Sequence, residues 1–238
     1  MIKRFFEIKK ESGIKVAVAK AVKYAPVIIL KNIGQRLFEM NSQRYWDYRL
    51  LFNWTSAGGD KQTQDFAESF IENVDRSYVE FGSILDFGCA LGDSASVFRR
   101  LSDDLEIYLW DISEVGLSKA IKRNQNSRVI RWDKTKKVEL VYCSNVIEHV
   151  LDTEALINKI CAASKKWVCI QAPYREVHAN GEKITPSNPN GEHIWTIDDD
   201  FIEKKLNLPI FSETRVFTGY ASQAWPFGKQ IYFIGRIP

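Results

Sequence analysis

The chain has 238 residues, of which 45% are hydrophobic and 26% are charged. This length suits one well-buried domain, and the composition is that of a globular protein, which excludes a disordered or fibrous chain. The 33 basic and 30 acidic residues leave a net charge of +3, which is too small to indicate a nucleic-acid-binding protein.

The charge is unevenly distributed along the chain. Residues 1–40 hold nine Lys or Arg and three Glu, a balance of +6, so the other 198 residues carry −3. The apolar side chains between Val18 and Ala25 lie on one helical stripe, and we expect a basic amphipathic helical segment over 1–40 that Pro26 interrupts. This segment could pack on the domain, dock to a partner or make a peripheral contact with an anionic membrane surface.

Two features indicate a cytoplasmic protein. No apolar run approaches the roughly 20 residues needed to span a bilayer, and the N-terminal pattern is not that of a signal peptide. The four cysteines show no C-x-x-C spacing and fall mostly in or beside expected strands, so we expect reduced core residues: Cys89, Cys143, Cys161 and Cys169.

From residue 83 onward, short apolar strands alternate with helices. Before them, Phe66, Phe70 and Val74 have helical spacing. The expected strands are Ile84–Phe87, Ile107–Trp110, Arg128–Arg131, Val138–Tyr142 and Trp167–Ile170, and helices are expected near Ser94–Leu101, Glu114–Lys122 and Thr153–Ala163. Fully apolar strands joined by helices predict a parallel sheet that is covered on both faces.

The last third of the chain has a different pattern. A long polar loop is expected from Ala172 to Trp195, and a helix N-terminus within Thr196–Asp200. Two final strands, near Ile210–Phe217 and Gln230–Gly235, are joined closely enough for an antiparallel pair. We therefore predict an α/β fold with a doubly wound, mostly parallel sheet, a C-terminal antiparallel hairpin and helices on both faces.

The most informative motif is the turn that follows the first strand. Its pattern is D-x-G-x-A-x-G, from Asp86 through Gly88 and Ala90 to Gly92. A dinucleotide fingerprint would require glycine where Asp93 stands, and a strand-end carboxylate repels a pyrophosphate. The same carboxylate suits a ligand that carries cations, and S-adenosylmethionine has an ammonium and a sulfonium. A turn without any ligand is the structural alternative.

Two further acids end the next strands. Asp111 comes nineteen positions after Gly92, a spacing at which an acid can accept both hydroxyls of a ribose. Asp133 follows Trp132 at the end of the third strand, where this pair could hold the amino group and ring face of an adenine.

These stretches resemble the Rossmann-like (class I) S-adenosylmethionine-dependent methyltransferases. The resemblance covers residues 83–171 and rests on the segments 85–92, 110–113 and 142–150. It implies a seven-stranded sheet with a reversed final strand, a methyltransferase domain over 41–238, and cofactor contacts from Asp86, Gly88, Ala90, Gly92, Asp111, Ile112, Trp132, Asp133, Ser144 and Asn145. Ala90 stands where the family usually has glycine.

The stretch after the fourth strand holds the candidate catalytic residues. Methyl transfer needs a proton removed from the attacking atom, and His149 is the candidate base because an imidazole titrates near neutral pH, with Glu148 beside it. A purely structural role for both residues is the alternative. No metal is expected, although Glu148 and His149 with His178 or His193 could hold a divalent ion, as some relatives with Glu-x-x-Glu-His do.

Aromatic and basic side chains in loops could bind the acceptor and close over it. They are Tyr45, Trp46, Arg49, Tyr174, Arg175, His178, His193 and Trp195. Since such groups suit a polyol, we expect O-methylation of a small or saccharide-type acceptor. Segments 173–176 and 191–195 resemble the corresponding segments of methyltransferases associated with bacterial surface-polysaccharide assembly. An amino-sugar nitrogen, a quinone-like phenol and a non-catalytic cofactor-binding role remain open, whereas the net acidic 41–238 disfavours an RNA acceptor.

Overall fold

A computed structural model of the chain describes residues 38–75, 78–125, 128–220 and 228–238. The basic helical segment predicted over 1–40 therefore lies almost entirely outside the described residues, and its proposed membrane contact stays a prediction. Among the helices that the structure describes, none has the length and apolar character required to cross a bilayer.

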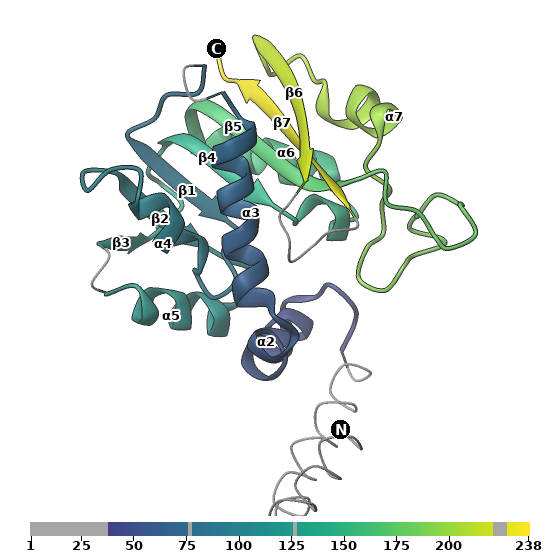
Figure 1. Cartoon of the computed structure of the whole chain (residues 1–238), viewed down its shortest axis with the longest axis horizontal. Coiled ribbons are helices and arrows are strands. Elements are labelled where there is room, and N and C mark those ends of the chain that lie inside the picture. The colour runs from purple at the N-terminus through teal and green to yellow at the C-terminus, as the bar shows by residue number, and fades with distance from the viewer. Residues whose placement is uncertain (1–37, 76–77, 126–127, 221–227) are drawn as a thin grey trace, which may run out of the picture.

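Seven strands form one sheet in the order β3-β2-β1-β4-β5-β7-β6 (Figure 1). The first five strands run parallel, β7 is antiparallel to β5, and β6 is antiparallel to β7. This confirms the predicted doubly wound sheet with a C-terminal antiparallel hairpin. The strands are β1 (Ser83–Phe87), β2 (Glu106–Trp110), β3 (Val129–Arg131), β4 (Val138–Ser144), β5 (Ser164–Tyr174), β6 (Glu213–Tyr220) and β7 (Lys229–Arg236).

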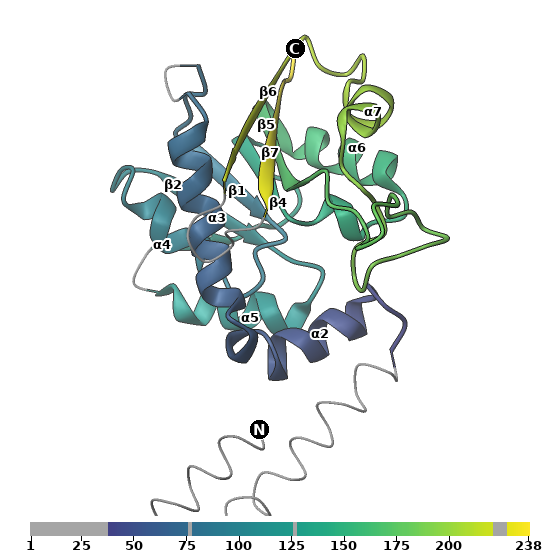
Figure 2. The same ribbon diagram turned by 45° about the vertical axis from the view of Figure 1, so that its right-hand side comes forward.

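Helices cover both faces of the sheet (Figure 2). One face carries α3 (Gly59–Asn73), α4 (Ser94–Arg99) and α5 (Glu114–Arg123). The other carries α6 (Thr153–Ala163) together with α7 (Asp199–Phe201) and η4 (Ile202–Leu206). Successive residues of a strand point to opposite faces, so Ile84 packs in the first layer and Leu85 in the second. Burial on both sides explains why the strands are continuously apolar.

The loop after β5 starts later than predicted, and the helix predicted after it is present. The predicted loop began at Ala172, but β5 continues to Tyr174 because β7 pairs with it as far as the Tyr174–Lys229 register. The helix start predicted near Asp198 is confirmed, since its carboxylate accepts a hydrogen bond from the Phe201 N–H at 3.0 Å. That helical segment is short and continues as the π-helical turn η4.

The topology places a crevice at the carboxyl ends of β1 and β4. The chain leaves β1 toward β2 and β3 and then returns to place β4 on the other side of β1. Open α/β sheets bind ligands at such a switch point. The helix α2 (Gln43–Phe52) and the turn η1 (Thr55–Ala57) lie across this end of the molecule, where α2 packs against α5 (Figure 1). All four cysteines are free and buried, as expected.

Candidate active site

A cavity of about 590 Å³ opens at the carboxyl ends of the parallel strands. Its walls come from the ends of β1, β2, β4 and β5, the start of β7, and the helices α2, α3 and α6. A volume of this size is typical of a small-molecule site. The cavity lies where the sequence predicts the cofactor.

The turn after β1 comes close to its neighbours because Gly88 and Ala90 adopt positive φ angles of 89° and 48°. A Cβ atom on Gly88 would lie 2.4 Å from Cγ2 of Val146, so only glycine fits there. The N–H of Ala90 donates to Asp111 Oδ2 at 2.8 Å. The first two strand ends are thereby tied together under the cavity.

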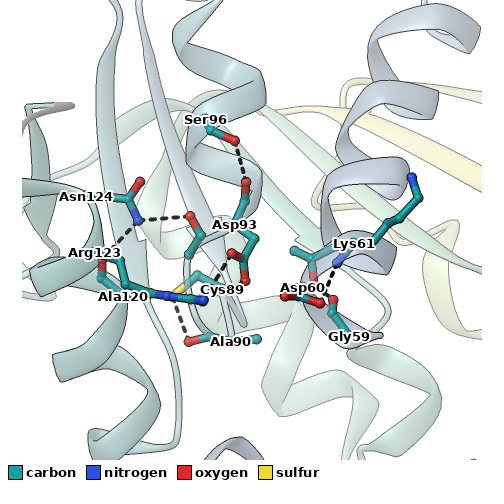
Figure 3. Close-up of polar contacts among 12 residues, drawn as sticks. Gly59, Asp60, Lys61, Cys89, Ala90, Asp93, Ser96, Ala120, Arg123 and Asn124 are labelled. Atoms are coloured by element: carbon teal, nitrogen blue, oxygen red, sulfur yellow. Dashed lines mark hydrogen bonds and ion pairs between the residues drawn. The ribbon is translucent and has the colours of Figure 1, made fainter. Parts of the chain in front are cut away.

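Helix α5 anchors the far side of the same turn (Figure 3). Arg123 pairs with the carboxylate of Asp93 at 3.1 Å, and Asn124 Nδ2 donates to the carbonyls of Gly92 and Ala120 at 3.0 and 2.9 Å. Asp93, whose presence excludes a dinucleotide fingerprint, therefore has a structural partner. Gly92 does not line the cavity, and its φ of 73° and its packing against Ala120 explain why it is glycine.

Two buried carboxylates, Asp86 and Asp111, line the cavity, and neither forms a salt bridge with a described residue. Burial is the main cause that raises the pKa of Asp86 to about 7, although the Ser94 hydroxyl, which donates to it, opposes the shift. Burial likewise raises the pKa of Asp111 to about 6, against the N–H groups of Ser113 and Ala90. A bound cation or hydroxyl donor would stabilise the ionised forms, so this end of the cavity suits a cationic nucleoside.

Twelve of the predicted site residues line the cavity. They are Trp46, Arg49, Asp86, Gly88, Ala90, Asp111, Ile112, Ser144, Asn145, Glu148, His149 and His193. The end of β4 and the turn after it therefore share one space with the first two strand ends and with α2. The roles of these residues toward a ligand remain predictions.

The predicted adenine pair lies outside the cavity. Asp133 is exposed and accepts hydrogen bonds from the N–H groups of Thr135 and Lys136, which lower its pKa. Trp132 is buried and donates from Nε1 to the carbonyl of Lys136. Both side chains are thus engaged in the local turn, and the aromatic residues that line the cavity near this point are Trp110 and Phe87, which pack against each other.

Four of the predicted acceptor residues lie away from the cavity. Tyr174 and Arg175 both contact the exposed carboxylate of Asp199. Nε2 of His178 donates to the carbonyl oxygen of Asn188 in its own loop at 3.0 Å. Trp195 donates to the carbonyl of Val150 and packs against the core. Each of these four side chains has a partner elsewhere in the domain, and none of them lines the cavity.

Glu192 contacts two of the predicted acceptor residues, Tyr45 and Arg49 of α2. Its carboxylate pairs with Arg49 at 2.8 Å and accepts a hydrogen bond from the hydroxyl of Tyr45. Its carbonyl accepts from Asn41 Nδ2 at 2.8 Å and lies 2.9 Å from Nδ1 of His149. Tyr45 therefore supports the wall without lining the cavity itself, and Glu192 joins α2 to the loop after β5.

Glu148, His149 and His193 form a cluster on this wall. Their candidate ligand atoms all lie within 4.8 Å of one another. Burial raises the pKa of Glu148 to about 7, and neither of its carboxylate oxygens has a hydrogen-bond partner among the described residues. Burial also lowers the pKa of His149 to about 3, so this ring is neutral at neutral pH, in contrast to the near-neutral titration expected from sequence.

The two imidazoles are oriented in the same way. A carbonyl oxygen can only accept, so Nδ1 of His149 carries the hydrogen that it donates to Glu192, and Nε2 is left with its lone pair. Nδ1 of His193 lies 2.6 Å from the carboxylate of Glu176. Burial by itself lowers the pKa of His193, but Glu176 and the nearby Glu148 outweigh burial and raise it. A ring held at Nδ1 presents Nε2, which is how metal-binding histidines are commonly oriented.

Sequence reasoning missed several residues of the cavity wall. Glu192 directly precedes the predicted His193, and this position next to a candidate site residue could have indicated it. Lys159 of α6 lies with Nζ 3.8 Å from the ring centroid of Trp110. For Lys159, Trp54, Gln62 and Gln230 the local sequence carries no signal, because only the packing of distant elements brings them to the cavity.

Comparison with known proteins agrees with this geometry. Residues 43–207 match the sequence family described as a methyltransferase domain. The comparison with curated protein sequences found no match.

Solved structures of similar fold include methyltransferases crystallised with the cofactor or its product. Magnesium protoporphyrin IX methyltransferase from Synechocystis with bound SAM shares 17% identity over 76% of this chain and 80% of that chain, with a TM-score of 0.50. Phosphoethanolamine N-methyltransferase 2 of Haemonchus contortus, in complex with phosphomonomethylethanolamine and S-adenosylhomocysteine, shares 16% over 74% and 53%, with a TM-score of 0.53. The N-terminal domain of EvdMO1, in the presence of S-adenosylhomocysteine and D-fucose, shares 16% over 74% and 83%, with a TM-score of 0.51.

The fold and the cavity define a Rossmann-like enzyme that uses S-adenosylmethionine. The chain belongs to the methyltransferase domain family, whose match covers more than half of its length.

Proposed function

We propose that the enzyme transfers the methyl group of S-adenosylmethionine to a hydroxyl oxygen of a small, saccharide-type acceptor. The observation that carries this proposal is the pairing of a neutral His149, whose Nε2 lone pair is available, with the buried and unpartnered carboxylate of Glu148, 4.0 Å away. A hydroxyl must lose a proton as it is methylated, and this pair lines the same cavity as the expected cofactor residues.

The proposed step is an in-line displacement. The acceptor oxygen forms a bond to the methyl carbon, and the bond between that carbon and sulfur breaks with its electrons left on sulfur, which converts the sulfonium into a thioether. The hydroxyl proton passes to Nε2 of His149. Burial disfavours the imidazolium, and the ionised form of Glu148, 4.0 Å from Nε2, would offset that cost in the proposed step. Removal of either residue should therefore impair transfer.

A divalent cation at the same cluster is a second candidate, because both imidazoles are held at Nδ1 by oxygen acceptors. Glu148, His149 and His193 would hold the ion, and its charge would favour ionisation of the acceptor hydroxyl. The buried carboxylate oxygens that lack partners fit such an ion. Methyl transfer from sulfur to the acceptor oxygen is the same in both versions. A His149 that held the ion could not accept the hydroxyl proton, which would then pass to solvent, and the two versions differ in their response to chelation.

The acceptor can be identified with labelled cofactor. Nucleotide-sugar and lipid-linked sugar pools would be incubated with the full chain and S-adenosylmethionine labelled in the methyl group, and products would be screened for a gain of one methyl. We expect transfer to a sugar hydroxyl, with a strong loss in His149→Ala and Glu148→Gln but retained binding of S-adenosylhomocysteine. Label found only on nitrogen or on a phenol, or full turnover in both variants, would contradict the proposal.

A further inference from the structure

Two glutamines on neighbouring strands are both completely buried but differ in their contacts. Gln171 of β5 accepts from the Tyr142 hydroxyl at 2.7 Å and donates to the Ser69 hydroxyl at 3.3 Å. Gln230 of β7 has no partner for either amide atom among the described residues. An unpaired buried amide costs stability, so a glutamine is an unfavourable choice at 230 unless something else completes its hydrogen bonds.

Gln230 lines the cavity, whereas Gln171 does not. It is paired with Pro173 at the carboxyl end of β5, and its strand lies three places from β1 in the sheet. With strands about 4.8 Å apart, this separates it by about 14 Å from the strand that carries Asp86. Gln230 therefore belongs to the acceptor half of the cavity, beyond the expected cofactor.

Among the described residues, buried side-chain atoms without a hydrogen-bond partner are concentrated at this cavity. Five of the eight residues with buried, unpartnered side-chain atoms in the described part of the chain line it, namely Asn41, Arg49, Trp54, Glu148 and Gln230. Gln230 is the only one of the five that offers a neutral donor and a neutral acceptor that are both unpaired. A hydroxyl group donates and accepts at once, so it can complete both of these hydrogen bonds, whereas a carbonyl or an ether oxygen would leave the amide oxygen unpaired.

We propose that Gln230 recognises a second hydroxyl of the acceptor, one that is not methylated, and so selects polyhydroxylated acceptors. This inference rests on the proposed saccharide acceptor and adds the residue that selects it. The unpaired amide then lowers the stability of the free enzyme because its hydrogen-bonding groups are reserved for the acceptor hydroxyl.

The two glutamines supply a matched pair of variants. Gln230→Met keeps side-chain volume and removes only unpaired polar atoms, so we expect the melting temperature of the full chain with saturating S-adenosylhomocysteine to rise by about 2–4 °C. Gln171→Met leaves the Tyr142 hydroxyl without its acceptor, so this substitution should lower the melting temperature. If Gln230→Met lowers the melting temperature as Gln171→Met does, Gln230 is structural and the proposal is wrong.

Binding supplies the second measurement. D-galactose and its monodeoxy analogues would be titrated into the wild type and Gln230→Met, each saturated with S-adenosylhomocysteine. We expect the wild type to bind one deoxy analogue about 5- to 150-fold more weakly than galactose. Gln230→Met should bind galactose and that analogue with equal affinity. Unchanged discrimination in the variant, or no sugar binding by the wild type, would overturn the proposal. Failure of the proposed function shows separately, as absence of a methylated sugar despite such binding.

Discussion

Nδ1 of His149 lies 2.9 Å from the main-chain carbonyl oxygen of Glu192, and the side chain of the same Glu192 is bound by Arg49 and Tyr45 of α2. One residue of the loop after β5 thus orients the candidate base with its backbone and fastens the loop to the N-terminal helix with its carboxylate. The position of the imidazole depends on a contact between segments that are more than 140 residues apart in the chain.

Glu192→Gln tests this connection. The substitution keeps the shape of the side chain but removes the charge that pairs with Arg49, so the loop and the His149 ring should be held less precisely. We expect kcat/KM for the identified acceptor to fall by about 10- to 100-fold, with little change in the affinity for S-adenosylhomocysteine. Arg131→Gln breaks the exposed Glu114–Arg131 pair and is the control, for which near-normal kinetics are expected. A loss of cofactor affinity equal to the loss of turnover would contradict a positioning role.

Ala90→Gly should stabilise the protein. Ala90 has a φ of 48°, a left-handed conformation that costs an alanine more than it costs a glycine. We expect the free energy of unfolding to rise by about 0.5–1 kcal/mol after the added chain entropy of glycine is counted. The affinity for S-adenosylhomocysteine should stay within about threefold. Chemical denaturation provides the measurement, and Ala95→Gly inside α4 is the control that should destabilise. A destabilised Ala90→Gly would show that the alanine methyl contributes more packing than strain.

The affinity for the cofactor should rise with pH. Burial raises the folded pKa of Asp86 to about 7 and that of Asp111 to about 6, so both are partly protonated in the free enzyme below neutral pH. Because a cationic nucleoside prefers the ionised forms, affinity for S-adenosylmethionine should increase from pH 5 to about pH 7 and level off above it, by at most tenfold per pH unit for each carboxylate. Calorimetric titrations across this range provide the measurement.

The same shifts predict the opposite trend for the stability of the free enzyme. The raised folded pKa values mean that the folded state binds more protons than the unfolded state between about pH 4 and 7, so these two groups make unfolding easier as pH rises through that window. Asp86→Asn should reduce this dependence, to which the raised pKa values of Asp111 and Glu148 also contribute, and should weaken cofactor binding. Asp104→Asn, in an exposed loop, should change neither. A pH-independent affinity in the wild type would exclude these carboxylates from cofactor recognition.

Chelation separates the two versions of the acceptor site. If His149 and Glu148 act alone, turnover survives exhaustive treatment with EDTA. If a cation occupies the cluster, turnover is lost and returns with added Mg²⁺ or Zn²⁺, and calorimetry detects binding of that ion to the wild type but not to His193→Ala. Survival of full activity after chelation would exclude the ion, whatever the variants show.

The cofactor half of the site follows from local sequence to a large extent. Asp86, Gly88 and Asp111 each terminate or follow an apolar strand, and parallel strands bring such positions to one edge of the sheet whatever the rest of the fold is. The acceptor half is different, because Glu192, Trp54 and Gln230 reach the cavity from three separate elements. Aromatic and basic character alone did not separate His193, which lines the cavity, from Trp195, which packs against the core.

The amino-acid sequence by itself determined the doubly wound sheet, its reversed C-terminal strand and the carboxylates that end its first strands, since periodicity and strand-end chemistry are local properties. Only the tertiary structure decided which polar groups remain unpaired at the cavity. Pairing depends on neighbours: Asp133 finds its donors within its own turn, Gln171 finds them on α3 and β4, and Gln230 finds none among the described residues. Identical side chains therefore differ in their hydrogen bonding according to what the fold places beside them.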